Sequence, residues 1–284
     1  MKLIPKGSNK LTKVGKSLQI TNKLIKEIDS REVTLADDFR CPIPEENFQK
    51  VLIEDYNIEV INNTVAYGDV KGIEKFDCRE KEIQSLEGIE YFTALTGLWC
   101  FNNQLTSLDV SNNPALTELI CMNNQLTSLD VSNNPALTEL ICMNNQLTSL
   151  DVSKNPALTK LWCNSNQLTS LDLSNNSALT NFNCTSNQLT SLDVSNNSAL
   201  TYLTCWWNQL TSLDVSKNPA LVILDCYSNQ LTSLDLRNNP VLLGILCRNN
   251  QLTSLDLSKN PKLIVVELSG NPGDWWKELE KDER

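Results

Sequence analysis

Eight cysteines follow one another at a constant spacing of 21 residues, and the segment between them is nearly the same each time. They are Cys100, Cys121, Cys142, Cys163, Cys184, Cys205, Cys226 and Cys247. An asparagine stands three residues after each cysteine, so the unit reads LxxLxCxxNQLTSLDVSxNPA. A unit this short cannot bury its apolar residues alone, so neighbouring units must stack and share one continuous core. The sequence therefore predicts a solenoid.

The strand of each coil is predicted just before the cysteine. In one unit, Leu119 and Cys121 point inward by two-residue alternation, and Ile120 between them points outward. The apolar spacing over the whole unit is too irregular for a single helix. Stacked coils then place their short strands side by side in a parallel sheet on one face.

The motif LxxLxCxxNxL resembles the leucine-rich-repeat signature, with cysteine at its third apolar position. The 21-residue unit LTxLDVSxNPxLTxLxC is similar to bacterial internalin-like proteins of the cysteine-ladder type, over roughly residues 70 to 272. This resemblance implies an α/β leucine-rich-repeat horseshoe. Its parallel β-sheet would line the concave face, with mostly turns, irregular chain or 3-10 helix on the convex face. Members of that family bind partners and are often surface adhesins, so the resemblance also implies an adhesin-like or effector-like protein-binding function.

Three regions are expected along the chain. Residues 1–69 form a basic arm and an N-terminal capping region with a helix near 44–55, and residues 70–272 form about ten coils. Residues 273–284 form a C-terminal cap and a charged tail. Both ends of a solenoid expose core and need covers. We expect the helix near 44–55 to cover the first coil, and Trp275 and Trp276 to seal the last.

The cysteines are expected to be reduced and packed in the core. The chain has ten, and the eight regular ones occupy an inward column where related repeats carry leucine. Neighbours in the column would lie about 4.8 Å apart, but their parallel Cβ vectors suit a disulfide poorly. A structural zinc site needs four converging ligands, whereas each coil offers one thiol.

Three polar columns also run through the repeats. The asparagine after each cysteine is expected to satisfy backbone groups at a tight turn. The aspartate of each D-x-S-x-N, such as Asp130, is predicted to form a turn, with calcium binding as the alternative. The threonine of LTSL, such as Thr127, is predicted to be a routine corner residue, with an ice-binding face as the alternative.

The residues that flank the inward cysteine vary from coil to coil while the frame barely changes. By alternation they face out from the concave sheet, and exposed aromatics on a soluble protein usually mark an interaction site. The candidate partner-binding residues are Trp99, Phe101, Ile120, Met122, Ile141, Met143, Trp162, Tyr202, Trp206, Trp207, Tyr227 and Arg248. The alternative is drift among duplicated repeats, because residues 115–135 and 136–156 are almost identical.

Composition argues against catalysis. The chain has no histidine, which removes Ser-His-Asp and Cys-His arrangements, and it has no P-loop or GxGxxG. We therefore expect a non-enzymatic protein with no cofactor and no metal site, which grips a protein partner through its concave aromatics. The alternative function is a structural repeat, or one that contacts a nonprotein surface such as a glycan or ice.

Charge and hydropathy limit the partners and the location. The net charge is −10, but residues 1–30 carry +5, so the remainder carries −15 and suits nucleic acid poorly. No apolar run approaches the roughly 18 residues of a membrane span. The N-terminus holds no apolar stretch of signal-peptide length. We therefore expect a monomer in the cytoplasm, with secretion by a signal-independent route as the alternative.

Overall fold

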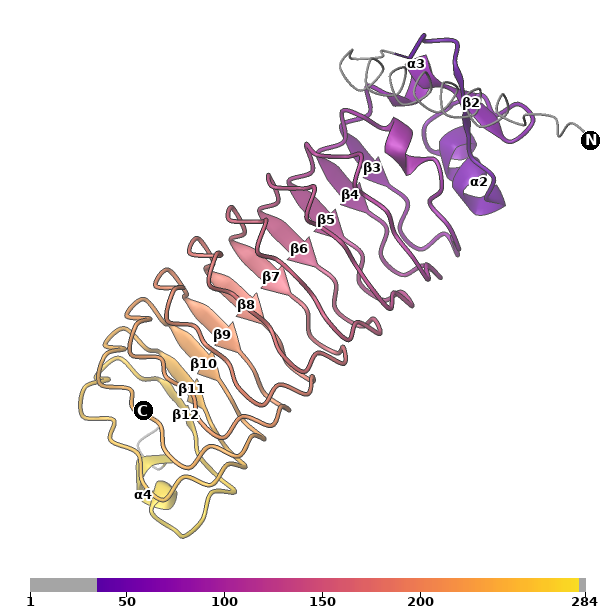
Figure 1. The fold of residues 1–284 in the computed structure, drawn as a ribbon. Helices are drawn as coiled ribbons and strands as arrows, with labels where there is room; N and C mark the ends of the chain where they lie inside the picture. Colours follow the sequence, from indigo (N-terminus) through magenta and orange to yellow (C-terminus); the bar gives the residue numbers. More distant parts are fainter. Residues whose placement is uncertain (1–34, 281–284) are drawn as a thin grey trace, which may run out of the picture.

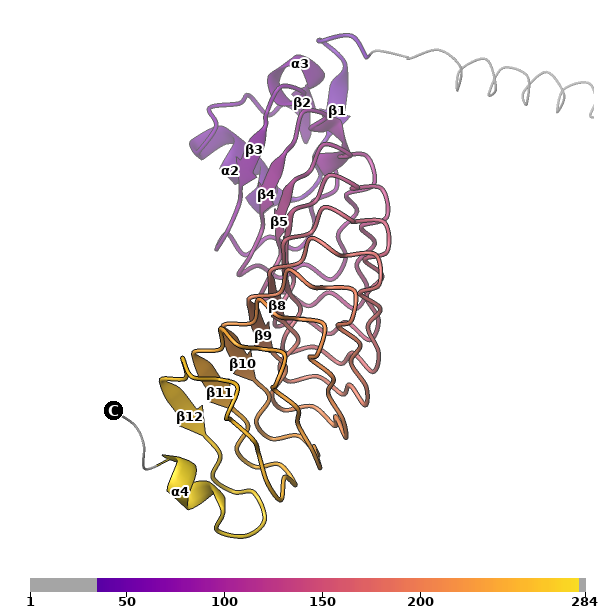
Figure 2. The ribbon, with the colours of Figure 1, turned by 90° about the vertical axis from the view of Figure 1, so that its left-hand side faces the viewer.

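The computed structural model describes residues 35–280, which form one curved solenoid with a cap at each end (Figure 1). Ten parallel strands make one sheet, in which every strand pairs with those of the neighbouring coils. They are β3 Lys75–Asp77, β4 Gly97–Trp99, β5 Glu118–Ile120, β6 Glu139–Ile141, β7 Lys160–Trp162, β8 Asn181–Asn183, β9 Tyr202–Thr204, β10 Ile223–Asp225, β11 Gly244–Leu246 and β12 Val265–Glu267. Figure 2 shows this sheet along the inner side of the curve. The predicted α/β horseshoe is confirmed.

The core is a stack of identical layers. In each coil the central strand residue and the residue after the strand point inward; the latter is a cysteine except in the last coil, which has Leu268. Leu119 and Cys121, for example, have no exposed surface. The two leucines of the following LTSL corner differ, since Leu126 is fully buried and Leu129 is 6% exposed. The register aligns equivalent residues, so that Leu119 pairs with Leu140 of the next coil. Each coil therefore closes the core of its neighbour, as the short repeat requires.

All ten cysteines are free and buried. Burial raises the pKa of the Cys142 thiol to about 12 and that of Cys41 to about 11. The other thiols of the regular column shift in the same direction for the same reason, as for Cys121. A protonated, inaccessible thiol is a poor nucleophile, so the column contributes apolar packing.

The asparagine after each cysteine ties one coil to the next. The amide nitrogen of Asn124 donates to the carbonyls of Cys100 and Cys121 at 3.0 and 3.1 Å, and its oxygen accepts from Leu105 N–H at 3.0 Å. The same pattern recurs along the solenoid, as at Asn166. The structural role expected for this column is confirmed.

A second asparagine column was not foreseen. The asparagine before each proline or serine of the turn is fully buried in most coils, and its amide nitrogen donates to two carbonyls of the preceding coil. For Asn134 these are the carbonyls of Val110 and Asn113, both at 2.9 Å. This second asparagine therefore also links each coil to the preceding one.

The aspartate column forms turns, as expected. Asp130 accepts a hydrogen bond from Ser132 N–H at 2.9 Å, and bonds from the Ser132 hydroxyl and N–H lower the pKa of this carboxyl. Within residues 35–280, no group of three or more acidic or thiol side chains is placed to hold a metal ion. In the same range, no helix is long and apolar enough to cross a membrane.

The N-terminal cap contains the expected helix, α2 (Glu46–Glu54), whose Phe48, Val51 and Leu52 are buried against the first coil. The cap also contains a two-stranded antiparallel sheet that was not predicted, β1 (Arg40–Pro42) with β2 (Thr64–Ala66). Two short helical segments follow, α3 (Tyr67–Val70) and η1 (Ile89–Tyr91). Most of the predicted basic arm lies outside the described residues.

At the other end, the two tryptophans pack where they were expected. Trp275 and Trp276 are partly buried against the core, and Trp276 is the first residue of α4 (Trp276–Glu280). The Trp275 indole N–H donates to the carbonyls of Pro272 at 2.9 Å and Leu252 at 3.3 Å. These contacts hold the indole over the end of the solenoid.

The buried thiols give a direct test of the core. In the native protein near pH 8, we expect a thiol reagent to modify almost none of the ten cysteines, because access and ionisation are both suppressed. After denaturation in guanidinium, all ten should react. Rapid modification of the native protein would contradict the buried column, and absence of reaction in both states would mean disulfides.

The asparagine ladder makes a second prediction. Asn166→Ala should lower the free energy of unfolding by about 2 to 4 kcal/mol, because it leaves several buried backbone groups without partners. The control is Asn175→Ala, since Asn175 is exposed and should change stability by less than about 0.5 kcal/mol. Urea denaturation measures both. Equal stability of the two variants would contradict the role of the ladder.

Candidate partner-binding face

Strand register places the predicted site residues on the concave face. Trp99, Ile120, Ile141 and Trp162 pair in sequence along one column, and Tyr202 lies in the column that begins each strand. The candidates directly after a cysteine lie on the same side by alternation. Trp207 stands one position further on, in the turn after the strand, and is exposed there. One expectation was wrong: Ile141 is only 5% exposed, so it belongs to the packed surface and offers little to a partner.

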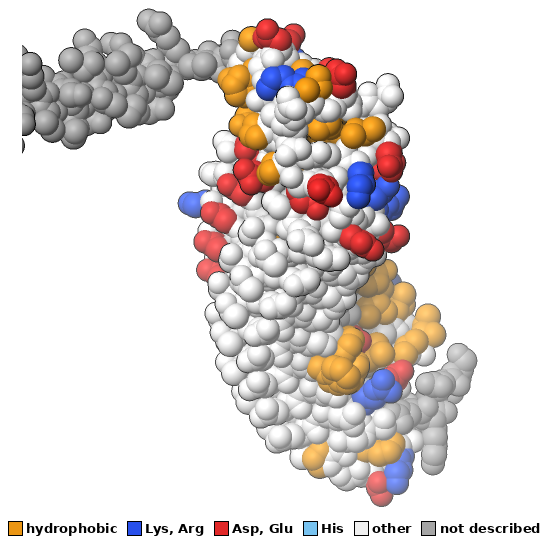
Figure 3. All heavy atoms as spheres, turned by 90° about the vertical axis from the view of Figure 1, so that its right-hand side faces the viewer, with side chains coloured by type: hydrophobic (Ala, Val, Ile, Leu, Met, Phe, Trp, Pro, Cys, Tyr) orange, Lys and Arg blue, Asp and Glu red, His pale blue; other side chains and the backbone are white. Residues whose placement is uncertain are grey.

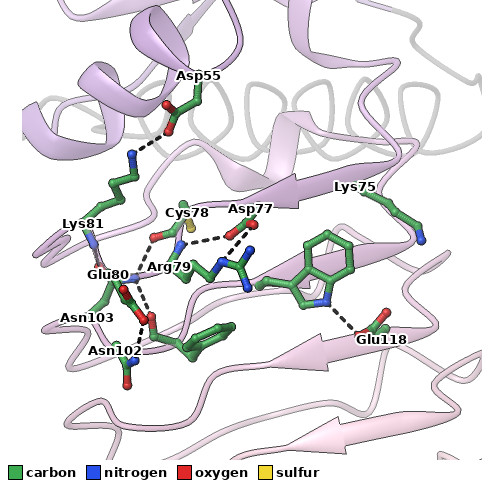
Figure 4. A network of polar contacts seen from close by, with 12 residues as sticks. Asp55, Lys75, Asp77, Cys78, Arg79, Glu80, Lys81, Asn102, Asn103 and Glu118 are labelled. Carbon is green, nitrogen blue, oxygen red and sulfur yellow. Dashed lines mark hydrogen bonds and ion pairs between the residues drawn. The ribbon is translucent and has the colours of Figure 1, made fainter.

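We define the N-terminal patch as Trp99, Phe101, Ile120, Met122, Ile141, Met143 and Trp162. Its rings are already engaged by the chain itself. The indole N–H of Trp99 donates to Glu118 at 2.8 Å (Figure 4), and Lys75 lies 5.4 Å from its ring centroid. The indole N–H of Trp162 likewise donates to Asn181 at 2.8 Å. These tryptophans are half-buried, so they offer only part of their surface.

We define the C-terminal cluster as Tyr202, Trp206, Trp207, Tyr227 and Arg248. The Trp206 and Tyr227 rings stack with centroids 4.9 Å apart and planes 13° apart. Arg248 lies 4.9 Å from the Tyr227 centroid, and Trp207 packs edge-on against Trp206 at 5.1 Å. Trp207 is 57% exposed and Tyr202 is 45% exposed. Figure 3 shows hydrophobic side chains on this hollowed side of the solenoid, next to basic and acidic groups.

Trp207 holds a backbone conformation that tryptophan rarely adopts. Its φ is 52°, in the left-handed region, where equivalent positions of other coils carry asparagine or serine, as at Asn123 and Ser186. A bulky residue in this region costs free energy that asparagine largely avoids. Strain of this kind concentrates at functional sites. The repeat pattern singles out Trp207 by its aromatic ring but does not reveal this backbone conformation.

Asp225 lies beside the C-terminal cluster and was not among the predicted site residues. It lies in the concave column between Thr204 and Leu246, beside Tyr227 of the cluster. Burial raises the pKa of its carboxyl to about 6, against a hydrogen bond from Tyr227 N–H and the charge of Arg248, which lower it. Its Oδ1 is buried and accepts no hydrogen bond from the described residues. In the sequence, the only sign that Asp225 belongs with the cluster is that this acidic residue stands close to aromatic ones.

No protein-family model matches the sequence, and no curated protein matches it either. Among solved structures, the functional domain of InlJ from Listeria monocytogenes, which includes a cysteine ladder, is 32% identical with a TM-score of 0.54. That match covers 84% of this chain and 63% of the InlJ chain. Internalin C2 of the same species is 21% identical with a TM-score of 0.61, covering 82% and 99% of the two chains, and shows the same fold. A chain of the LRIM1/APL1C complex is 25% identical with a TM-score of 0.59, covering 70% and 40%.

The stacked strands, the buried leucine layers and the asparagine ladder together define a leucine-rich-repeat protein. Within that class the 21-residue period and the regular buried cysteine column distinguish this chain. It is an internalin-like leucine-rich-repeat protein of the cysteine-ladder type. The matched region spans 63% of the length of the InlJ chain.

The Asp225 carboxyl makes stability depend on pH. Because its folded pKa of about 6 lies above the ordinary value of 3.8, the folded protein binds this proton more tightly than the unfolded chain. The stabilisation that this protonated carboxyl gives the folded protein is therefore complete below about pH 4 and is lost as pH rises through 6. Asp225→Asn should stabilise the protein by about 1 kcal/mol at pH 7.5, after allowance for solvent screening at this partly exposed group.

Thermal melts of the two proteins at pH 4 and pH 7.5 test this, and the difference should vanish at pH 4. Asp214→Asn is the control: it removes the same charge from an exposed turn whose hydrogen bonds lower the pKa of the carboxyl. A stabilising effect of Asp225→Asn that is equal at both pH values would contradict the burial of this carboxylate.

Proposed function

We propose that the protein binds a partner protein on its concave face, with the C-terminal cluster as the anchor. The fold supports the general class, since structural neighbours such as the LRIM1/APL1C complex include leucine-rich-repeat proteins that assemble with other proteins. Leucine-rich-repeat proteins of this kind are generally non-enzymatic, and the absence of histidine agrees with a binding role.

The observation that supports the site most strongly is that Trp207 is 57% exposed and has a φ of 52°. Large aromatic residues and arginine dominate the energies of measured interfaces, and Trp206, Trp207, Tyr227 and Arg248 supply both kinds. Burying one such ring contributes roughly 1.5 to 3 kcal/mol by its area, so a few anchors support a micromolar contact. The N-terminal patch is the weaker candidate, because its rings already contact the chain's own polar side chains.

The variant Trp207→Asn tests the anchor without damage to the fold. Asparagine stands at the equivalent position of other coils, as at Asn123, so the substitution should stabilise the protein by about 1 kcal/mol. The same variant should weaken partner binding by at least tenfold, because it removes an exposed ring. Urea denaturation measures stability, and capture of partner proteins by the immobilised chain, followed by titration, measures binding.

The matched control is Trp162→Leu, which alters a concave ring of the N-terminal patch and should leave binding within about threefold of wild type. Unchanged binding by Trp207→Asn, with loss by Trp162→Leu, would move the site to the N-terminal patch. Capture of glycans in place of protein would contradict the proposal.

A further inference from the structure

Three aromatic rings of the concave face each hold a cation that also pairs with a carboxylate. They are Trp162 with Lys160 and Glu139, Tyr227 with Arg248 and Glu267, and Phe101 with Arg79 and Asp77. In that order the cation lies 4.2, 4.9 and 5.5 Å from the ring centroid, with a nitrogen 2.8, 3.3 and 3.1 Å from the carboxylate. The ring face attracts the cation through its quadrupole, and the carboxylate fixes its direction. This surface therefore repeats one arrangement of ring, cation and carboxylate.

Trp207 and Asp225 supply a ring and a carboxylate without a cation. Trp207 N–H bonds to the Tyr227 carbonyl at 3.2 Å and Cys205 N–H bonds to the Asp225 carbonyl at 2.8 Å, so the two residues lie on adjacent coils. Since Asp225 pairs with Thr204, Trp207 is offset from Asp225 by three residues along the strand direction and one coil across it, or about 11 Å between Cα atoms. Within residues 35–280, no lysine or arginine lies over the Trp207 ring or pairs with Asp225.

The charged groups that the chain itself brings near Asp225 are few. Its strand neighbours Thr204 on β9 and Leu246 on β11 are uncharged. Arg248 already pairs with Glu267 and lies over Tyr227, so it serves the adjacent arrangement. The thiols beside the strand stay protonated, because burial raises the pKa of Cys205 and Cys226. The Asp225 carboxylate therefore has no cation of its own.

The charge of the whole solenoid favours a cationic ligand here. Beyond residue 30 the chain holds 17 basic residues against 32 acidic ones. A net negative field raises the local concentration of cations and speeds their association. A free ammonium ion would gain the charge contact alone, whereas a lysine or arginine also brings a methylene stem that packs on an exposed indole.

We propose, on the basis of the proposed function, that the concave position between Trp207 and Asp225 receives a lysine or arginine side chain from an extended segment of the protein partner. The charged head group pairs with Asp225, and the stem lies along Trp207. The partner thus completes a fourth arrangement of the kind that the chain builds three times on its concave face from its own residues.

Selection of a random dodecapeptide library on the immobilised full-length chain at pH 7.5 tests this. Enriched peptides should share a lysine or arginine, and its replacement by norleucine in the strongest peptide should weaken binding at least tenfold. Asp225→Asn should weaken the original peptide by a similar factor, and the two changes together should cost little more than either alone, since they remove one contact. Asp214→Asn removes the same formal charge from a turn and should change binding less than twofold.

Acidity provides an independent readout. Because a bound cation favours the ionised carboxylate, peptide affinity should fall about tenfold from pH 7.5 to pH 5, and Asp225→Asn should remove that dependence. The peptide for this measurement should contain no histidine or acidic residue.

The outcomes separate the two proposals. Enriched peptides that need Trp207 but lack a shared cation, or that bind Asp225→Asn as well as wild type, overturn the cation site and leave the proposed function standing. Peptides that bind Trp207→Asn and Asp225→Asn unchanged, or a selection with no enrichment above background, overturn both.

Discussion

The hydrogen bonds of one asparagine amide per coil are the interaction on which this architecture depends. Each strand is only three residues long, so strand pairing alone joins neighbouring coils through few bonds. The tight turn after the strand would leave backbone carbonyls and N–H groups buried without partners. An asparagine amide carries two donors and an acceptor on a short side chain, and Asn124 uses both kinds to join two coils. The pitch of the solenoid, and therefore every column on its surface, follows from this repeated link.

Two residues of the candidate site are unfavourable for their positions in the repeat, and each lowers the free energy of unfolding. Trp207 occupies a left-handed position suited to asparagine, and Asp225 keeps a carboxylate where burial disfavours its charge. Their coincidence on adjacent coils is the pattern expected where selection for binding outweighs selection for stability. In the N-terminal patch, by contrast, polar and basic side chains of the same chain already contact the tryptophan rings.

The period of the repeat made the fold predictable. The alternation around Cys121 placed Leu119 inside and Ile120 outside, and the structure agrees. What the sequence did not reveal depends on neighbours from other coils. Ile120 and Ile141 have nearly identical local sequences, yet Ile141 is buried beside its register partner Trp162. The raised pKa of Asp225 likewise comes from burial by the surrounding coils, which a linear pattern does not describe.

The stacked rings of Trp206 and Tyr227 come from successive coils, and their 4.9 Å separation equals the distance that the sheet imposes between strands. Arg248 continues the same column over Tyr227. Folding has therefore already frozen the rotamers of these long side chains before any encounter. Association with this surface loses little further conformational entropy, so more of the contact energy remains as affinity.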